Sequence, residues 1–132
     1  DDQAYRVRIL DQLKRCHGGG SDEDYVRMYE ASMVRDEGMA KTVTAALLTA
    51  RQRPQDHTLI LSYTGGGHIQ FNLPIPKRVA RRMDGQVAQA TVYLASFDHT
   101  RIEDIQDLVQ DGIADYVWLT PISQQGPPHR CK

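Results

Sequence analysis

The apolar run Leu59-Ile60-Leu61-Ser62-Tyr63 restricts the fold more than any other feature, because Gly65-Gly66-Gly67-His68 follows it almost at once. A short, almost wholly apolar run is typical of a strand that is covered on both faces. We therefore expect a strand over residues 58–63. Sheets built from such strands carry helices on both sides, so the run favours an α/β protein.

The rest of the chain alternates between helical and extended patterns. Ser21 and the acidic residues 22–24 have the composition of a helix start, and Pro54 ends that helix. A brief extended segment is expected at 69–71. Strands that alternate with helices predict a parallel or mixed sheet with flanking helices. The predicted helices span 3–16, 21–53, 77–83 and 100–111, and the predicted strands span 58–63, 90–95 and 116–119.

Three strands make a thin sheet, and a central strand such as 58–63 needs neighbours on both sides. The pattern therefore predicts that this chain is part of something larger. We expect a helical region over 1–53 and an α/β region over 54–122 that carries the glycine turn. The polar, Pro-rich residues 123–132 are expected to form a flexible tail.

Composition excludes several classes of function. The 132 residues suffice for one domain, and 40% apolar with 25% charged residues is typical of a globular protein. A formal net charge of −1 gives no general reason to bind nucleic acid or an anionic membrane. No apolar run approaches the ~20 residues of a membrane span. The two cysteines, Cys16 and Cys131, are unrelated thiols or a bridge formed in an oxidising compartment.

The turn Gly65-Gly66-Gly67-His68 is the first candidate for chemistry. Ligands of open α/β sheets gather at the carboxyl ends of strands, where this turn is expected. Glycines let backbone N–H groups approach a ligand, and histidine binds metals or transfers protons. The pattern is neither a P-loop nor a dinucleotide fingerprint. Taken alone, it is equally compatible with a tight turn that carries an ordinary histidine.

Three other patterns have a structural as well as a functional interpretation. The basic run 77–82 could bind carboxylates or phosphates, or form a solvated helix face. The one-sided stripe of Tyr25, Tyr29 and Met33 favours core packing. The sequence Arg35-Asp36-Glu37 fits either a buried ion pair or the surface.

Taken together, these pieces resemble the ChaN-like haem-binding lipoproteins, which are related to erythromycin-esterase and TraB/Tiki-type proteins. The resemblance rests on four elements that occur in the family's order. Residues 16–18 are similar to a His-Cys-Gly element, and residues 33–40 to Arg-Asp-x-x-Met-Ala. Residues 63–68 with 74–82 are similar to a Gly-Asn-Gly-His strand end and the helix after it, and residues 114–121 to a terminal Ala-Asp-Tyr strand. Gly66 stands where the family has Asn, and Leu73 where it has Gly. The family's first Gly-Glu-x-His motif has no counterpart in the chain. The resemblance therefore implies the C-terminal half of a larger α/β domain, with residues 1–53 as a helical cap region and 54–122 as an α/β half-domain.

The resemblance implies haem binding in iron uptake at the bacterial cell envelope, with periplasmic or outer-membrane localisation. Membrane contact would require a lipid anchor that is absent from this chain. It also implies a homodimer, or association with an N-terminal half of the same domain. Haem needs an axial ligand, an apolar slot and cations for its propionates. The residues that the resemblance implies for this site have three roles. His68, carried over with its motif glycines Gly65 and Gly67, is the metal ligand, and Tyr63 and Tyr29 are other axial candidates. Met28 and Met33 would line the slot, and the propionates would bind Arg78, Arg81 and Arg82.

Two functions of other classes compete with haem binding. In an esterase or metal-dependent peptidase of the same superfamily, His68 would be a base or a metal ligand. The sequence places no carboxylate at short spacing from His68, so we expect no catalysis from this chain alone. In an interaction module, an uncovered apolar strand would complete the sheet of a partner.

Overall fold

The computed structural model describes residues 2–53, 59–98, 100 and 102–122. The chain begins with two helices, α1 (Gln3–Cys16) and α2 (Asp22–Arg51). Asp2 caps α1 by accepting from the N–H of Ala4. Ser21 and Asp24 form a reciprocal capping box at the start of α2, which satisfies N–H groups that lack helical partners. Both helices lie where the sequence predicts them.

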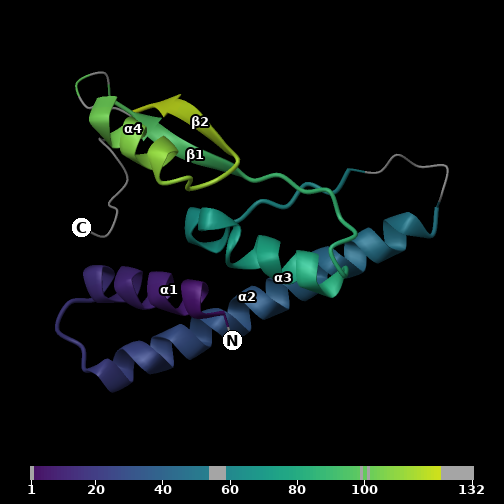
Figure 1. The fold of residues 1–132 in the computed structure, drawn as a ribbon, viewed down its shortest axis with the longest axis horizontal. Coiled ribbons are helices and arrows are strands. Elements are labelled where there is room, and N and C mark those ends of the chain that lie inside the picture. The colour runs from purple at the N-terminus through teal and green to yellow at the C-terminus, as the bar shows by residue number, and fades with distance from the viewer. Residues whose placement is uncertain (1, 54–58, 99, 101, 123–132) are drawn as a thin grey trace.

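Helix α1 folds back along the first half of α2, as Figure 1 shows. The contact is aromatic, because Tyr5, Tyr25 and Tyr29 are all buried. The rings of Tyr5 and Tyr29 lie 5.8 Å apart, and the Tyr25 hydroxyl donates to the carbonyl of His17 at 2.7 Å. The prediction that the tyrosine stripe forms core is therefore confirmed for Tyr25 and Tyr29.

Helix α3 (Ile75–Arg82) packs against the second half of α2 (Figure 1). It begins with Pro76 in its first turn, where a missing N–H costs nothing. Its buried side chains join Ala40 of α2 in a core cluster, and partly buried residues of α2 surround that cluster. The cluster consists of Ala40, Ile75, Val79 and Met83, flanked by Met39, Val43, Leu47 and Val87.

The sheet consists of two parallel strands, β1 (Val92–Phe97) and β2 (Tyr116–Pro121), joined through α4 (Ile102–Gln110). Val92 pairs with Tyr116, and the register continues to Phe97 and Pro121. One face buries Tyr93 and Ala95 with Ile113. The chain is therefore an α/β protein with a parallel sheet and flanking helices, and two of the three predicted strands are confirmed with shifted bounds.

The predicted strand over 58–63 is wrong. Residues 59–65 form no strand or helix, and the side chains of Leu59, Leu61 and Tyr63 are 87%, 89% and 89% exposed. A strand exists only where a neighbour supplies ladder hydrogen bonds. In the described residues β1 pairs with β2 alone, so this apolar segment has no ladder to join. Thr58 lies outside those residues.

The segment expected to be extended at 69–71 is also different. Two short 3-10 turns, η1 (Gly66–His68) and η2 (Gln70–Asn72), are separated by Ile69 alone. Phe71 and Asn72 both have φ of 57°, in the left-handed region, which costs free energy for residues other than glycine. The Phe71 N–H donates to the carbonyl of Ile113 at 2.6 Å. Tertiary contacts thus override the local preference for extended backbone.

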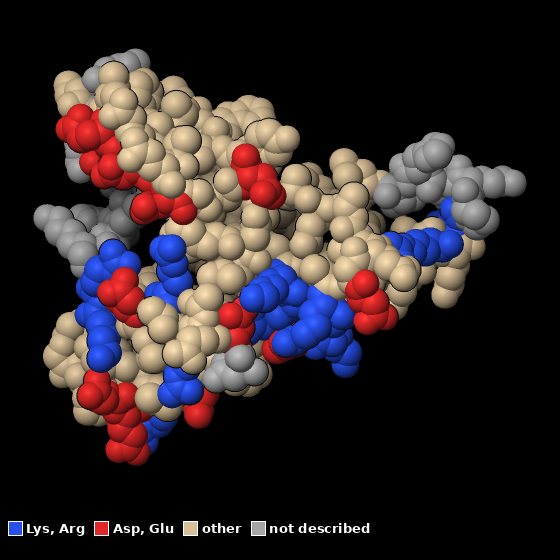
Figure 2. All heavy atoms as spheres, in the orientation of Figure 1, with Lys and Arg blue, Asp and Glu red and all other residues tan. Residues whose placement is uncertain are grey.

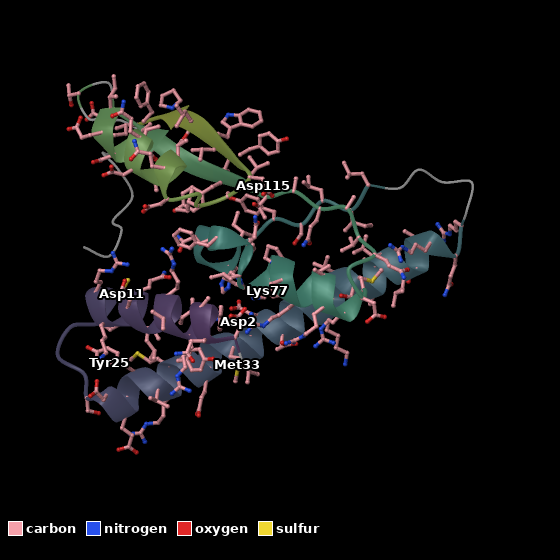
Figure 3. All side chains as sticks on the ribbon, in the orientation of Figure 1. Asp2, Asp11, Tyr25, Met33, Lys77 and Asp115 are labelled. Carbon is pink, nitrogen blue, oxygen red and sulfur yellow. The ribbon has the colours of Figure 1, made fainter. Side chains whose placement is uncertain are left out.

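A hydrogen-bonded cluster of Asn72, Thr91 and Asp115 fixes this turn to the sheet. The amide of Asn72 donates to Asp115 at 3.0 Å, and the Thr91 N–H donates to the same carboxylate at 2.7 Å. That N–H, more than any other contact, holds the pKa of the Asp115 carboxyl below its usual range. Figure 3 shows Asp115 between the sheet and the segment that leads to α3.

Several expectations fall outside the described residues. The tail 123–132 and Cys131 lie there, so the expected flexible tail and a bridge from Cys131 to Cys16 stay predictions. The division into 1–53, 54–122 and 123–132 stays a prediction. Across the part of the chain that is described, no helix is both long enough and apolar enough to cross a membrane.

Candidate functional site

The last residue of η1, His68, is held by a carboxylate on α2. Its Nδ1 lies 2.6 Å from Oδ1 of Asp36, whose side chain is only 2% exposed. The other carboxylate oxygen of Asp36 accepts a 2.5 Å hydrogen bond from the hydroxyl of Tyr5 on α1. Three segments far apart in sequence therefore meet at one buried carboxylate.

This geometry assigns roles to the two nitrogens of His68. A carboxylate can only accept, so with Asp36 in that form Nδ1 carries the proton and donates it. In the neutral imidazole the lone pair is then on Nε2, for which no partner occurs among the described residues. The side chain of His68 is 26% exposed. Nε2 is therefore a nitrogen that can bind a metal or accept a proton.

The fold thus gives His68 a carboxylate partner that short sequence spacing does not reveal. Asp36 is 32 positions earlier in the chain, and no short spacing connects the two residues. The sequence did contain one signal. Asp36 lies seven residues after Tyr29 and four before Ala40, on the buried side of α2. A buried acid on an apolar helix side needs a partner, but helical periodicity does not say which. Nothing in the sequence singled out Tyr5.

Tyr5 links this pair to a buried arginine. The guanidinium of Arg78 lies 4.1 Å from the centre of the Tyr5 ring and donates to the carbonyl of Pro74 at 2.9 Å. Burial, followed by the hydrogen bond and negative charge of Asp36, raises the pKa of the Tyr5 hydroxyl. Tyr5 therefore stays a neutral donor to Asp36 throughout the ordinary pH range.

The basic run 77–82 does not present free cations. Three of its arginines bind Glu37: Arg78 through Nε at 3.1 Å, Arg82 at 2.5 Å, and Arg81. Burial favours a higher pKa for Glu37, but the hydrogen bonds from Arg82 and Arg81 outweigh it and the pKa is lowered. Figure 2 shows the blue side chains of this cluster gathered over α3. Of residues 35–37, Glu37 forms these ion pairs with its side chain 29% exposed, whereas Asp36 is the buried acid.

A cavity of about 420 Å³ lies beside the glycine turn. Gly66 and Gly67 form part of its wall, with Tyr5, Phe71 and Tyr93 among its aromatic lining. A Cβ on Gly66 would approach the Tyr93 ring to 2.6 Å, so only glycine fits there. His68 itself does not line this cavity.

A second cavity of about 700 Å³ lies between α2 and α3, lined by Met33, Glu37 and Arg81 among others. At its edge Lys77 forms an ion pair with Asp2, and Figure 3 shows the two residues side by side where α1 begins. The cavity is therefore bordered by cations that already have acidic partners.

The structure brings together only some of the expected site residues. His68 lies directly after the motif glycines Gly65 and Gly67, and Arg78 and Arg81 share Glu37. Tyr63 projects from the unpaired segment and is 89% exposed. Tyr29 is 3% exposed, and its hydroxyl donates to the sulfur of Met33 at 3.9 Å.

A histidine positioned by a buried acid, near a partly aromatic cavity in a small α/β fold, is an arrangement that can bind a cofactor or small molecule. Within the described residues no three His, Cys, Asp or Glu side chains cluster as a self-sufficient metal site. The family model for haem-binding uptake proteins of the Tiki superfamily, ChaN, matches residues 1–79. The chain therefore belongs to this family. No curated protein and no solved structure matches the chain.

Proposed function

We propose that this chain binds haem and that Nε2 of His68 is the axial ligand to the iron. The observation that carries the proposal is the 2.6 Å contact between His68 Nδ1 and the buried carboxylate of Asp36. Histidines that bind metals almost always donate their other ring N–H to such an acceptor, which fixes the tautomer and increases ligand basicity. When bound, haem supplies an iron centre with one or two open axial positions.

The other requirements of haem also have candidates. A cavity with aromatic and aliphatic walls adjoins the glycine turn. For the propionates we propose Arg78 and Arg81 as cations, which would have to exchange the carboxylate of Glu37 for a propionate. Tyr29, with its hydroxyl on Met33, and the exposed Tyr63 are weaker axial candidates than His68.

The family supports a role in haem uptake. We propose that the role is played at the bacterial cell envelope, with the chain anchored as part of a lipoprotein and associated with a second copy or with an N-terminal half. The apolar segment 59–63, exposed and unpaired, supports such association.

Haem titration of the purified chain tests the proposal. A saturable Soret shift is expected for the wild type, and its spectrum should change in His68→Ala. His17→Ala is the matched control, because His17 lies at the end of α1 and its backbone, rather than its side chain, makes the contact with Tyr25. Tyr29→Phe and Tyr63→Phe test the alternative ligands. Identical spectra for the wild type and His68→Ala would exclude His68, and no Soret shift in the wild type would exclude haem binding by this chain.

The same pair favours a second candidate function, hydrolysis. A histidine oriented by a buried carboxylate is the arrangement of a general base, which activates a hydroxyl or water. Because Asp36 is that carboxylate, the lack of an acidic residue at short sequence spacing from His68 no longer argues against catalysis. Turnover of simple aryl esters by the wild type, lost in both His68→Ala and Asp36→Ala and retained in His17→Ala, would favour this function. No turnover above the buffer rate would leave haem binding as the role of the pair.

A further inference from the structure

The cavity beside the glycine turn is lined by a cation that has no acidic partner in the described part of the chain. Arg8 of α1 lines it, and its guanidinium lies 3.7 Å from the centre of the Phe71 ring. The other cation of the wall, Arg15, is bound to Asp11 at 2.6 Å. Within the described residues Arg8 forms no ion pair, in contrast to Arg78, Arg81 and Arg82, which share Glu37. Arg8 is therefore the guanidinium that an incoming anion can bind without displacing a protein carboxylate.

The position of the Phe71 ring is maintained against a backbone preference. Phe71 and Asn72 both have φ of 57°, and residues other than glycine are rarely held there. The bond from Phe71 N–H to Ile113 and the cluster of Asn72 with Asp115 and Thr91 maintain this conformation. Strain that is sustained by surrounding contacts tends to lie at functional sites. Here it places an aromatic ring under Arg8 on the wall of a cavity.

The size and lining of the cavity indicate the class of ligand. Its volume of about 420 Å³ falls within the range of roughly 300–1,000 Å³ for small-molecule sites. Phe71, Tyr93 and Leu108 supply apolar and aromatic surface, whereas Arg8 and Gln12 supply polar groups from α1. Asp111 is the one acidic residue among the described residues that line the cavity. Figure 2 shows blue side chains on α1 and red ones on α4 on the two sides of this opening.

We propose that this cavity binds a flat, largely aromatic molecule that carries an acidic group, and that Arg8 recognises the acid. The guanidinium offers several N–H donors in a plane, which suits a carboxylate or sulfonate. The rings of Phe71 and Tyr93 provide surface for the flat body. Two sources share this chemistry: the propionate edge of haem, in which case the site refines the proposed function, and a separate small aromatic acid.

Binding of 8-anilinonaphthalene-1-sulfonate, a flat aromatic anion whose fluorescence rises in apolar surroundings, tests the site without haem. Arg8→Gln is expected to weaken its binding about tenfold, the loss of one charge-assisted hydrogen bond at a partly exposed site. Arg8→Lys should bind with intermediate affinity. Arg35→Gln is the matched control, because Arg35 is exposed on α2 and lies outside both cavities. Gly67→Leu, which extends a side chain from the wall toward Gln12, should weaken binding through size instead of charge.

Two porphyrin arms distinguish the sources. If Arg8→Gln weakens binding of haem but not of haem dimethyl ester, the acid is a propionate. If it weakens sulfonate binding alone, the ligand is a separate aromatic acid. A wild type that binds the sulfonate through Arg8 but shows no Soret shift would exclude the proposed haem function while supporting this site. Equal affinities of wild type, Arg8→Gln and Gly67→Leu for the sulfonate and for haem, with unchanged circular dichroism, would overturn the proposal.

Discussion

The imidazole Nδ1 of His68 lies 2.6 Å from the carboxylate of Asp36, although the two residues are 32 positions apart in the chain. Asp36 is buried, and Tyr5 donates to its second oxygen. A buried carboxylate with two donors is stable only while both remain, because each donor offsets part of its lost hydration. The pair therefore positions His68 and also ties α1, α2 and the glycine turn together.

Asp36→Asn should impair haem binding more than it impairs folding. An amide can accept from Tyr5 while it donates to His68 Nδ1, which moves the ring proton to Nε2 and removes the lone pair needed for iron. We expect haem affinity to fall about 10–100-fold, the usual cost of losing such a partner of a metal-binding histidine. Spectral titration measures this effect. An affinity equal to that of the wild type would show that Asp36 does not position the ligand.

Glu37→Gln should destabilise the protein in a pH-dependent way. Its carboxylate binds three arginines, one of them buried, so we expect a loss of about 1–2 kcal/mol in the free energy of unfolding at pH 7. Because the folded pKa of Glu37 is below the ordinary 4.5, this stabilisation is complete above that pH and is lost as pH falls through the lowered pKa.

Urea denaturation of wild type and Glu37→Gln between pH 7 and pH 3 measures the difference. The free energies of unfolding of the two proteins should converge as the pH approaches 3. Glu30→Gln is the control, because Glu30 is exposed on the same helix and has no ion pair in the described structure. A difference that persists unchanged at pH 3 would show that the charge of Glu37 is not what stabilises the cluster.

Gly66→Ala should cost about 1–3 kcal/mol, because the new methyl would overlap the ring of Tyr93 at 2.6 Å. Gly18→Ala is the matched control: nothing lies within 4 Å of a methyl there, and changes at open positions usually stay within about 0.5 kcal/mol. Denaturation midpoints measure both variants. Equal midpoints would mean that the turn shifts away from the ring at no cost.

The chain should associate in solution. Leu59, Leu61 and Tyr63 are almost fully exposed on an unpaired segment. One face of the sheet is exposed as well, through four side chains: Val92, Leu94, Tyr116 and Trp118. Exposed apolar surface and free strand edges favour pairing with another chain.

Light scattering over a dilution series measures this association. Leu61→Lys should weaken it, whereas Val34→Lys, at an exposed apolar position on α2, should not. A wild type that stays monomeric at every concentration would refute the prediction.

Local chemistry in the sequence determined where most elements form. The caps at Asp2 and Ser21, the proline in the first turn of α3 and the apolar period of α2 act over a few residues, so they can be recognised along the chain. Local patterns in the sequence also predict the strands near 90–95 and 116–119. The motif around His68 also indicated the family that the match over 1–79 shows.

Only the tertiary structure decided which residues meet. Whether Leu59-Ile60-Leu61 becomes a strand depends on a neighbour for its backbone, which β1 and β2 do not provide. The left-handed backbone of Phe71 and Asn72 is sustained by contacts with Ile113, Thr91 and Asp115. The partnership of His68 with Asp36 depends on how α2 packs under the glycine turn. Such contacts cannot be recognised along the chain, because their free energy arises only once packing has removed water from both groups.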